Sequence, residues 1–328
     1  MLRCSFTCDC GKSLPDMLIK ALPAVVLAIG LALTGCTAGG NASSQSSVSA
    51  SADTAADAPE VDRDPQGELP AITFNSKGIP TMATVASDPP TVISVKTLTA
   101  GDGAIVAAGD YVKVDYAGFL WSDGTQFDSS YDSGTPARFA LNQVVDGWKY
   151  GLVGTKVGDR VEVVIPAEYG YGDEEQDSIP AGSTLVFVVD ILATTTITTE
   201  ALTSATLTQA TLPEGITVTG ELGQEPTLTI AADAAEPTEQ QTIVLAEGNG
   251  ATVTETDSLF YHMVVGEWGS ETSSSWSSSY QEIDSGGGSV TVGQRVGSRL
   301  LLISPADEEN ETAARAYVID ILAAIPAE

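Results

Sequence analysis

Residues 112–192 have the sequence VKVDYAGFLWSDGTQFDSSYDSGTPARFALNQVVDGWKYGLVGTKVGDRVEVVIPAEYGYGDEEQDSIPAGSTLVFVVDIL. This stretch and the residues just before it contain β-branched and aromatic runs that are bounded by Gly, Pro and Asp, which is typical of strands. The runs predict four main strands at 91–98, 111–121, 160–165 and 184–192.

One segment within this stretch has the period of a helix. Between 142 and 154, the apolar residues recur at spacings of three and four: Val144, Val145, Trp148 and Leu152. Asn142 is placed to cap the helix and Gly154 to end it. We therefore expect an α+β fold, in which an antiparallel β-sheet curls around one short helix.

Aromatic residues are concentrated in the same part of the chain. Of 20 aromatic residues, 12 lie between Tyr111 and Phe187. A hydrophobic core alone would account for such a concentration, and Trp148 on the inner face of the helix would then be an ordinary core residue. An aromatic binding cleft is the functional alternative.

The order of the motifs favours the cleft, because it resembles the FKBP family of peptidyl-prolyl cis-trans isomerases, which also bind macrolides. The resemblance covers the strand tyrosine, the GTQFDSS turn, the VVDGW helix start, the YGYG loop, the IP turn and the TLVFVV strand. It implies an FKBP-like fold and a pocket formed by Tyr116, Phe127, Asp128, Val144, Val145, Trp148, Tyr171, Ile179 and Phe187.

In this family, Trp148 would be the floor of the pocket, and Asp128 and Tyr171 its polar groups. The tyrosine hydroxyl and the backbone N–H at Ile179 would bind carbonyls of the substrate or ligand. One residue departs from the family pattern: Ala137 stands where the best-known members have an aromatic residue. That departure weakens the expectation of tight macrolide binding more than the expectation of catalysis.

The chemistry of proline isomerisation suits such a pocket. Rotation about an X-Pro bond crosses a barrier of about 18–20 kcal/mol because resonance keeps the amide planar. A twisted amide has lost much of its polarity, so an apolar cleft without water favours it over the planar form. The reaction requires no cofactor and no covalent intermediate.

Beyond residue 68 the chain contains two similar halves. Short matches occur in the same order in both, which predicts a domain at 69–195, a Thr-rich linker at 196–211 and a second, homologous domain at 212–328. The matched pairs are Leu69-Pro70 with Leu212-Pro213, 80–82 with 226–228, 101–104 with 248–251, 156–160 with 295–299 and 189–193 with 319–323.

The second half lacks several pocket elements, and we expect it to be a degenerate copy. Met263 replaces the strand tyrosine, Trp276-Ser277 is matched to Phe127-Asp128, and the helix with its tryptophan is largely deleted. A structural or partner-binding role is predicted for this half.

The N-terminal residues predict export. The apolar run 22–33 follows Lys20 and precedes Cys36, and it is typical of a signal peptide spanning 1–35 rather than of a transmembrane helix. LTGC at its end resembles a bacterial lipobox, so Cys36 is expected to be lipidated. An uncleaved membrane anchor is the alternative. Residues 36–68 are small and polar, and we expect a flexible tether; the alternative is an unaligned piece of the first domain.

The first sixteen residues fit a signal peptide poorly, and the true start is expected at Met17. Cys4, Cys8 and Cys10 lie in that segment. A metal or redox site formed by these cysteines is the alternative, but cleavage would discard it.

Charge and composition exclude several functions. The net charge of −30 argues against nucleic acid as a partner. With His262 as the single histidine, a serine or cysteine triad and a zinc site are disfavoured. No metal is expected; the acidic loop 173–177 is interpreted as solvated, with calcium binding as the alternative.

Together these features predict a lipid-anchored prolyl isomerase at the outer face of the cytoplasmic membrane. Its partners would be proline-containing exported polypeptides, and a macrolide would be a possible weak ligand. The rival interpretation is a non-enzymatic module that binds proline peptides, or a scaffold that depends on the second half.

Overall fold

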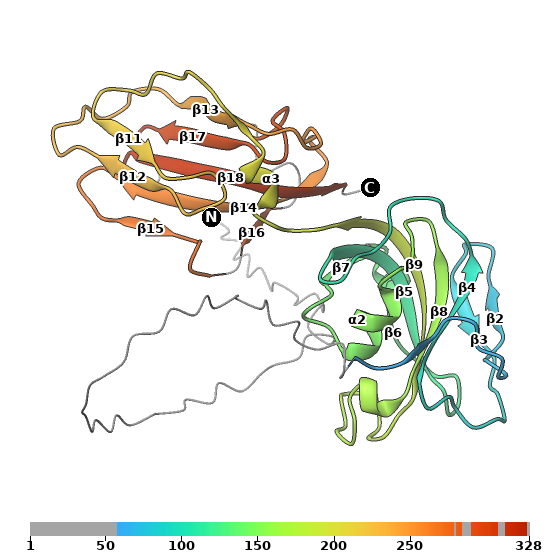
Figure 1. Ribbon diagram of the computed structural model, residues 1–328. Helices are drawn as coiled ribbons and strands as arrows, with labels where there is room; N and C mark the ends of the chain where they lie inside the picture. The colour runs from blue at the N-terminus through green and yellow to red at the C-terminus, as the bar shows by residue number, and fades with distance from the viewer. Residues whose placement is uncertain (1–57, 279, 284–289, 308–311, 327–328) are drawn as a thin grey trace, which may run out of the picture.

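The computed structural model describes residues 58–278, 280–283, 290–307 and 312–326. Within them the chain forms two seven-stranded sheets, joined by the segment that follows strand β9 (Figure 1). The predicted signal peptide, Cys36 and the first part of the predicted tether lie outside the described residues. No helix among the described residues is long and apolar enough to cross a membrane.

The first sheet has the strand order β1-β4-β8-β9-β5-β6, with β7 paired to β5. Short helices α1 and α2 and a 3-10 turn complete the unit. The element bounds are β1 Val61–Asp62, β4 Ile93–Thr99, β5 Tyr111–Leu120, β6 Gln126–Ser129, α1 Ser130–Ser133, β7 Ala137–Ala140, α2 Asp146–Leu152, β8 Arg160–Ile165, the 3-10 turn Ala167–Tyr169 and β9 Leu185–Thr195.

This unit confirms the expected mostly antiparallel sheet, and beside the expected helix α2 it contains a second short helix, α1. Strand β8 spans the residues predicted for it, and the other three predicted strands shift by no more than three residues at either end. The N-terminal cap of the helix was predicted wrongly: α2 begins at Asp146, and its cap is Val145. Asn142 lies in a turn, because the N–H of Gln143 donates to Ala140. Gly154 follows the helix with a positive φ of 87°, as predicted.

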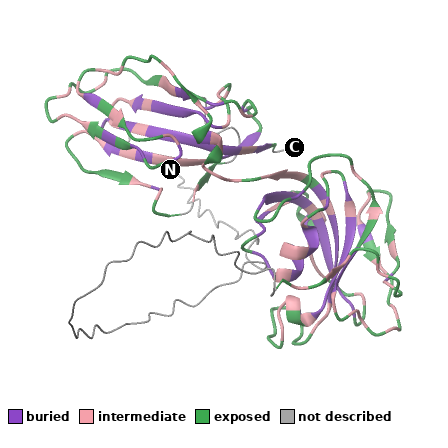
Figure 2. Cartoon of the chain, viewed as in Figure 1, coloured by how far each residue is buried: buried purple, intermediate pink, exposed green. Residues whose placement is uncertain are grey.

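Two hydrophobic layers lie on opposite faces of the sheet. Helix α2 lies on the concave face, where the chain is largely buried (Figure 2). A large hydrophobic cluster that includes Trp148 packs there. On the convex face, buried residues such as Phe119 and Trp121 pack against Ile72 and Met82. These two come from a hairpin formed by β2 Ile72–Phe74 and β3 Pro80–Met82. The helix and the hairpin therefore cover the two faces.

The second sheet has the order β10-β13-β17-β18-β14-β15, with β16 paired to β14. Each strand takes the place of its counterpart in the first sheet, and a hairpin of β11 and β12 again precedes the long strands. The bounds are β10 Thr206–Leu207, β11 Ile216–Thr219, β12 Thr227–Ile230, β13 Gln241–Glu247, β14 Asp257–Glu267, β15 Thr272–Ser274, β16 Gln281–Ile283, β17 Arg299–Ser304 and β18 Arg315–Pro326.

Hydrogen bonds also correspond between the two sheets. The N–H of Tyr116 donates to the hydroxyl of Ser130, and that of Met263 donates to the hydroxyl of Ser275, both at 2.9 Å. Met263 therefore takes the place of Tyr116, as predicted. The match of Trp276 with Phe127 was wrong, because Trp276 directly follows Ser275 and so corresponds to the residue after Ser130.

The connecting segments contain more structure than expected. In the predicted linker, α3 Glu200–Thr203 is followed by β10, which pairs with β13. Leu202 is fully buried. At the other end, β1 in the predicted tether pairs with β4 in parallel. Both segments bury apolar side chains, which their polar composition concealed; Val61 packs against the main core cluster.

The two units contact each other near the start of β5. The ring of Tyr111 lies 4.6 Å from that of Phe260, centroid to centroid. The Tyr111 hydroxyl donates to the carboxylate of Glu282 at 2.9 Å. The ammonium of Lys113 donates to the carbonyl of Pro326 at 3.3 Å. This contact combines a small apolar cluster with two polar bonds.

Candidate functional site

Two glycines of α2 allow the helix to lie directly on the sheet and to carry Trp148 inward. A Cβ on Gly147 would lie 2.3 Å from Ile165, and a Cβ on Gly151 would lie 3.0 Å from Val163. Real side chains do not tolerate the first distance. The short spacing between helix and sheet places Trp148, which is 1% exposed, in the centre of the concave cluster.

Three aromatic rings surround Trp148, and all meet it edge to face. The centroid distances are 5.5 Å to Tyr116, 5.3 Å to Phe139 and 5.3 Å to Phe187. Phe127 extends the cluster through an edge contact of 5.5 Å with Phe187. Aromatic pairs with this geometry stabilise each other beyond their buried area. The result is a preformed aromatic wall.

The indole N–H of Trp148 is buried and has no hydrogen-bond partner within the described residues. Tryptophan usually pairs its N–H when buried. Here the ring contributes as an apolar surface, which is the property that a floor for a proline ring requires.

The polar groups lie at one side of this wall. The hydroxyl of Tyr116 donates a hydrogen bond to the carboxylate of Asp128. The other oxygen of Asp128 accepts the N–H of Ser129 at 2.8 Å. Burial, followed by the bond to Asp128, raises the pKa of Tyr116. Burial, followed by the charge of Asp128, raises the pKa of Tyr171 to about 12. Both tyrosines therefore keep their protons at neutral pH.

The remaining predicted residues join the same cluster. Val144, Val145 and Ile179 are buried, and Phe127 and Tyr171 pack against them while partly exposed. The structure thus brings together all nine residues assigned by the resemblance: Tyr116, Phe127, Asp128, Val144, Val145, Trp148, Tyr171, Ile179 and Phe187.

One expected role is already occupied. The N–H of Ile179, which the resemblance assigns to a substrate carbonyl, donates to the carbonyl of Gln176 at 2.7 Å. This tight turn surrounds Asp177, whose φ is 42°. A substrate carbonyl would have to compete with Gln176 for this donor.

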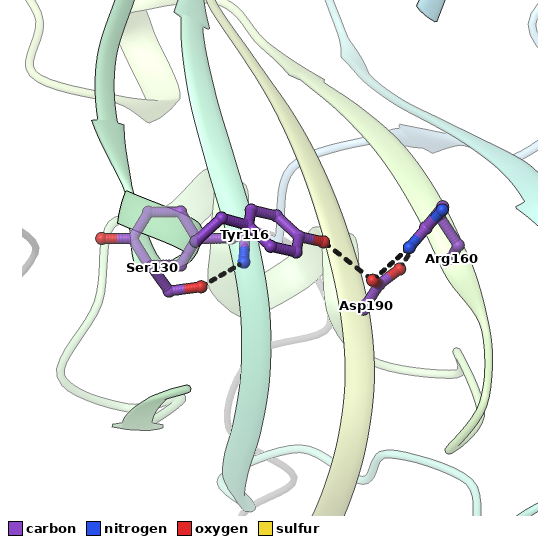
Figure 3. Close-up of polar contacts among 5 residues, drawn as sticks. Tyr116, Ser130, Arg160 and Asp190 are labelled. Atoms are coloured by element: carbon purple, nitrogen blue, oxygen red, sulfur yellow. Dashed lines mark hydrogen bonds and ion pairs between the residues drawn. The ribbon is translucent and has the colours of Figure 1, made fainter. Parts of the chain in front are cut away.

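A second polar network fixes the opposite face of the sheet. Arg160 and Asp190 form an ion pair between β8 and β9, and the Tyr131 hydroxyl donates to Asp190 at 2.8 Å. Ser130, next to Tyr131, accepts the N–H of Tyr116 (Figure 3). The strand that carries Tyr116 is therefore held from the convex side.

Sequence reasoning missed two residues that support the site. Phe139 is 6% exposed and contacts Trp148, and alternation along β7 would have placed it inward. Arg63 contacts α2 from 87–90 residues away, and no local signal indicates it.

No group of three or more metal-ligating side chains is placed to hold a metal ion within the described ranges, which include the acidic loop 173–177.

Comparison with known proteins concerns the first unit. The family model "FKBP-type peptidyl-prolyl cis-trans isomerase" matches residues 103–192. An "FK506-binding protein" of Streptomyces anulatus is 43% identical over 110 residues, covering 32% of this chain and 89% of that protein. The chain belongs to the FKBP-type peptidyl-prolyl cis-trans isomerase family.

Two further proteins are similar to this chain over different shares of their own length. A "Probable FK506-binding protein" of Corynebacterium glutamicum is 38% identical over 104 residues, covering 32% of this chain and 88% of that protein. The crystal structure of FkpA from Escherichia coli is 35% identical, with a TM-score of 0.30, and covers 38% of this chain and 51% of that one. The FKBP model ends at residue 192, where β9 is nearly complete.

Proposed function

We propose that the first unit catalyses cis-trans isomerisation of X-Pro bonds. The observation that carries the proposal is the aromatic wall around Trp148, with Tyr116 bound to Asp128 at its side. A proline ring held against Trp148 would place its amide among apolar rings. Water would be excluded, and the less polar twisted amide would be favoured over the planar one.

The Tyr171 hydroxyl would donate a hydrogen bond to the substrate, while the Tyr116 hydroxyl, which already donates its proton to Asp128, would hold that carboxylate in place. Because burial raises the pKa of each tyrosine, both hydroxyls stay protonated across the physiological range. A non-covalent reaction needs no more than this. The direct test is a protease-coupled isomerisation assay on an X-Pro tetrapeptide with the full chain. Tight peptide binding without turnover would favour a non-enzymatic binding module instead.

For macrolides, we propose weak binding in the same pocket. Support comes from FK506-binding proteins as relatives and from the nine assembled pocket residues. Ala137 on β7, opposite Val114, leaves the wall smaller than an aromatic residue would. FK506 should therefore bind, but the missing ring should reduce its affinity.

The second unit is proposed to be a degenerate copy without isomerase activity. The shared strand order and the paired bonds of Tyr116 and Met263 support common ancestry. Between β16 and β17, no helix occurs among the described residues 290–298. Among the described residues of this unit, no helix with a tryptophan lies at the place of α2 to serve as a floor for a proline ring. Its contact through Tyr111 and Glu282 favours a structural role.

Export and lipid attachment are proposed from the sequence alone. The run 22–33 and Cys36 support a lipoprotein that assists the folding of exported polypeptides at the outer face of the cytoplasmic membrane. Two acyl chains on Cys36 would give stable anchoring, since one chain binds only marginally. Cys36→Ser should release the protein from the membrane fraction or block its maturation. Membrane retention with normal cleavage would contradict this.

The start site has its own test. A chain that begins at Met17 should be exported and anchored as well as one that begins at Met1, because Lys20 and residues 22–33 supply a complete signal. Poor export from Met17 would show that Cys4, Cys8 and Cys10 matter.

A further inference from the structure

Arg63 reaches across the edge of the first sheet to the end of helix α2. Its guanidinium donates to three carbonyl oxygens there: Tyr150 at 3.0 Å, Gly151 at 3.2 Å and Val153 at 2.5 Å. Val153 is the C-cap of α2. Partial burial lowers the pKa of Arg63, but a guanidinium keeps its charge at physiological pH.

The end of a helix leaves carbonyls without partners inside the helix, and it carries partial negative charge. In α2, the carbonyl of Leu152 accepts the N–H and hydroxyl of Thr155, at 3.0 and 2.6 Å. Arg63 donates to the carbonyls before and after that of Leu152. A single side chain thus supplies both hydrogen bonds and a positive charge to this terminus.

Helix α2 needs such support because it is short. It has seven residues, two of which are glycines, and its N-cap makes no side-chain hydrogen bond. Helices of this length are unstable by themselves, and each glycine weakens them further. The same helix carries Trp148, so any fraying of α2 displaces the floor of the aromatic wall.

The position of Arg63 is itself fixed by the sheet. Val61 and Asp62 pair with Ile93 and Ser94 of β4 as a short parallel strand. Val61 also packs against the cluster that contains Trp148. Arg63 directly follows Asp62, so the pairing of β1 with β4 places its side chain beside the end of α2.

We propose that Arg63 is a positioning residue of the isomerase site, which holds α2 and thereby Trp148 in place. This inference rests on the proposed isomerase function. If Arg63 has this role, strand β1 and the residue that follows it are part of the support of the proposed pocket. Any displacement of β1 from β4 would withdraw Arg63 from the helix.

The test compares variants of the full chain by hydrogen exchange of the α2 amides and by isomerase rate. Arg63→Gln removes the charge and the forked donor, and Arg63→Lys keeps the charge alone. Lys149→Gln is the matched control, because Lys149 is the basic residue in the last turn of α2 and its ammonium lies over the ring of Tyr150.

In Arg63→Gln, amides of residues 148–152 should exchange about tenfold faster, while those of β9 keep their wild-type rate. The catalytic efficiency should fall about five- to tenfold. Arg63→Lys should recover part of both losses, and Lys149→Gln should change neither by more than about twofold.

Unchanged hydrogen exchange in α2 would overturn the proposal, because Arg63 would then not support the helix. Equal acceleration of exchange in α2 and β9 would also overturn it, because that result shows only general destabilisation. Normal catalysis by a variant with an exposed α2 would overturn it as well. If the wild-type chain shows no isomerase activity, the proposed function fails, and the exchange measurement still decides whether Arg63 holds the helix.

Discussion

The hydroxyl of Tyr116 donates to the carboxylate of Asp128, which joins the central strand β5 to the short edge strand β6 beside the aromatic wall. Both residues are also held by backbone bonds, Tyr116 through its N–H to Ser130 and Asp128 through the N–H of Ser129. These bonds hold the polar groups beside the aromatic wall in place, and in the proposed site they would orient a peptide without large rearrangement.

Tyr116→Phe should lower the isomerase rate by up to about tenfold, because it removes one orienting hydrogen bond of about 0.5–1.5 kcal/mol. Tyr131→Phe is the matched control. It removes a tyrosine-to-aspartate bond as well, at 2.8 Å to Asp190, but on the convex face. Both variants should lose similar stability in urea, and only Tyr116→Phe should lose rate. Equal rates in the two variants would contradict a role for Tyr116 in the site.

Tyr171→Phe should also reduce the rate modestly, whereas Phe127→Ala should reduce it more. Phe127 contacts Phe187 edge to face, so its loss opens the pocket to water. Truncation of a packed phenylalanine costs about 3–5 kcal/mol of stability when the site cannot collapse. Rates must therefore be measured with the unfolding free energy, at a temperature where both variants are folded. If Tyr171→Phe lowered the rate more than Phe127→Ala, the polar groups would contribute more to catalysis than the apolar wall, which would contradict the proposal.

Ala137→Phe tests the departure from the family pattern. The larger side chain should extend the wall and tighten FK506 binding, while peptide turnover stays within a few fold. Titration calorimetry with FK506 measures the first, and the tetrapeptide assay the second. Unchanged affinity would show that the missing ring at 137 does not limit macrolide binding.

Glu162 predicts a pH-dependent stability. It is fully buried on the convex face, and neither carboxylate oxygen has a hydrogen-bond partner among the described residues. Burial raises its pKa to about 7, and the charge of Lys96 opposes the shift. Arg160 and Asp190 lie nearby but pair with each other.

Because the folded-state pKa exceeds the unfolded value, the contribution of Glu162 to stability is fully present below about pH 4.5. It is lost as the pH rises to about 7, by roughly 3 kcal/mol. Leu301 takes the equivalent place in the second sheet, opposite Val318 as Glu162 is opposite Val188. Glu162→Leu should therefore fold and should remove this pH dependence. Urea unfolding of both forms at several pH values measures it; identical profiles would refute the assignment.

The two units should differ in activity when expressed separately. Residues 58–195 should isomerise X-Pro bonds at nearly the full-length rate, and residues 196–328 should show none. These boundaries replace 69–195 and 212–328, because β1 and Arg63 support the first unit and α3 packs on the second. Circular dichroism establishes that each piece is folded. Turnover by residues 196–328 would contradict the degenerate copy.

Local patterns predicted the strands and the helix that carries Trp148, because each depends on neighbouring residues, whereas the other pocket residues were implied by the resemblance to the FKBP family. Strand β8 has its predicted bounds, and Trp148 lies where the helical spacing placed it. The Ser-rich stretch that contains Trp276 had no such pattern. The sequence comparison therefore aligned Trp276 with Phe127, which is the wrong register. The pairing of Val264 with Ser274 in the sheet gives the correct one.

Contacts between distant segments could not be predicted. Arg63 belongs to a polar stretch, and only its three bonds to the end of α2 reveal its importance. The bond from the Ile179 N–H to Gln176 is local, but it was missed as well, because it depends on the positive φ of Asp177 in the turn between them. The resemblance to the FKBP family named the candidate pocket residues, whereas a supporting contact such as that of Arg63 requires the three-dimensional structure.

The most direct test of the central claim is the isomerisation rate of an X-Pro tetrapeptide, measured with the wild-type full chain and with Trp148→Leu. Leucine keeps the floor apolar but removes the flat aromatic surface that Trp148 provides. The wild-type chain should accelerate isomerisation in proportion to its concentration, and Trp148→Leu should lose most of that acceleration while remaining folded. A folded wild-type chain that leaves the uncatalysed rate unchanged would contradict the account.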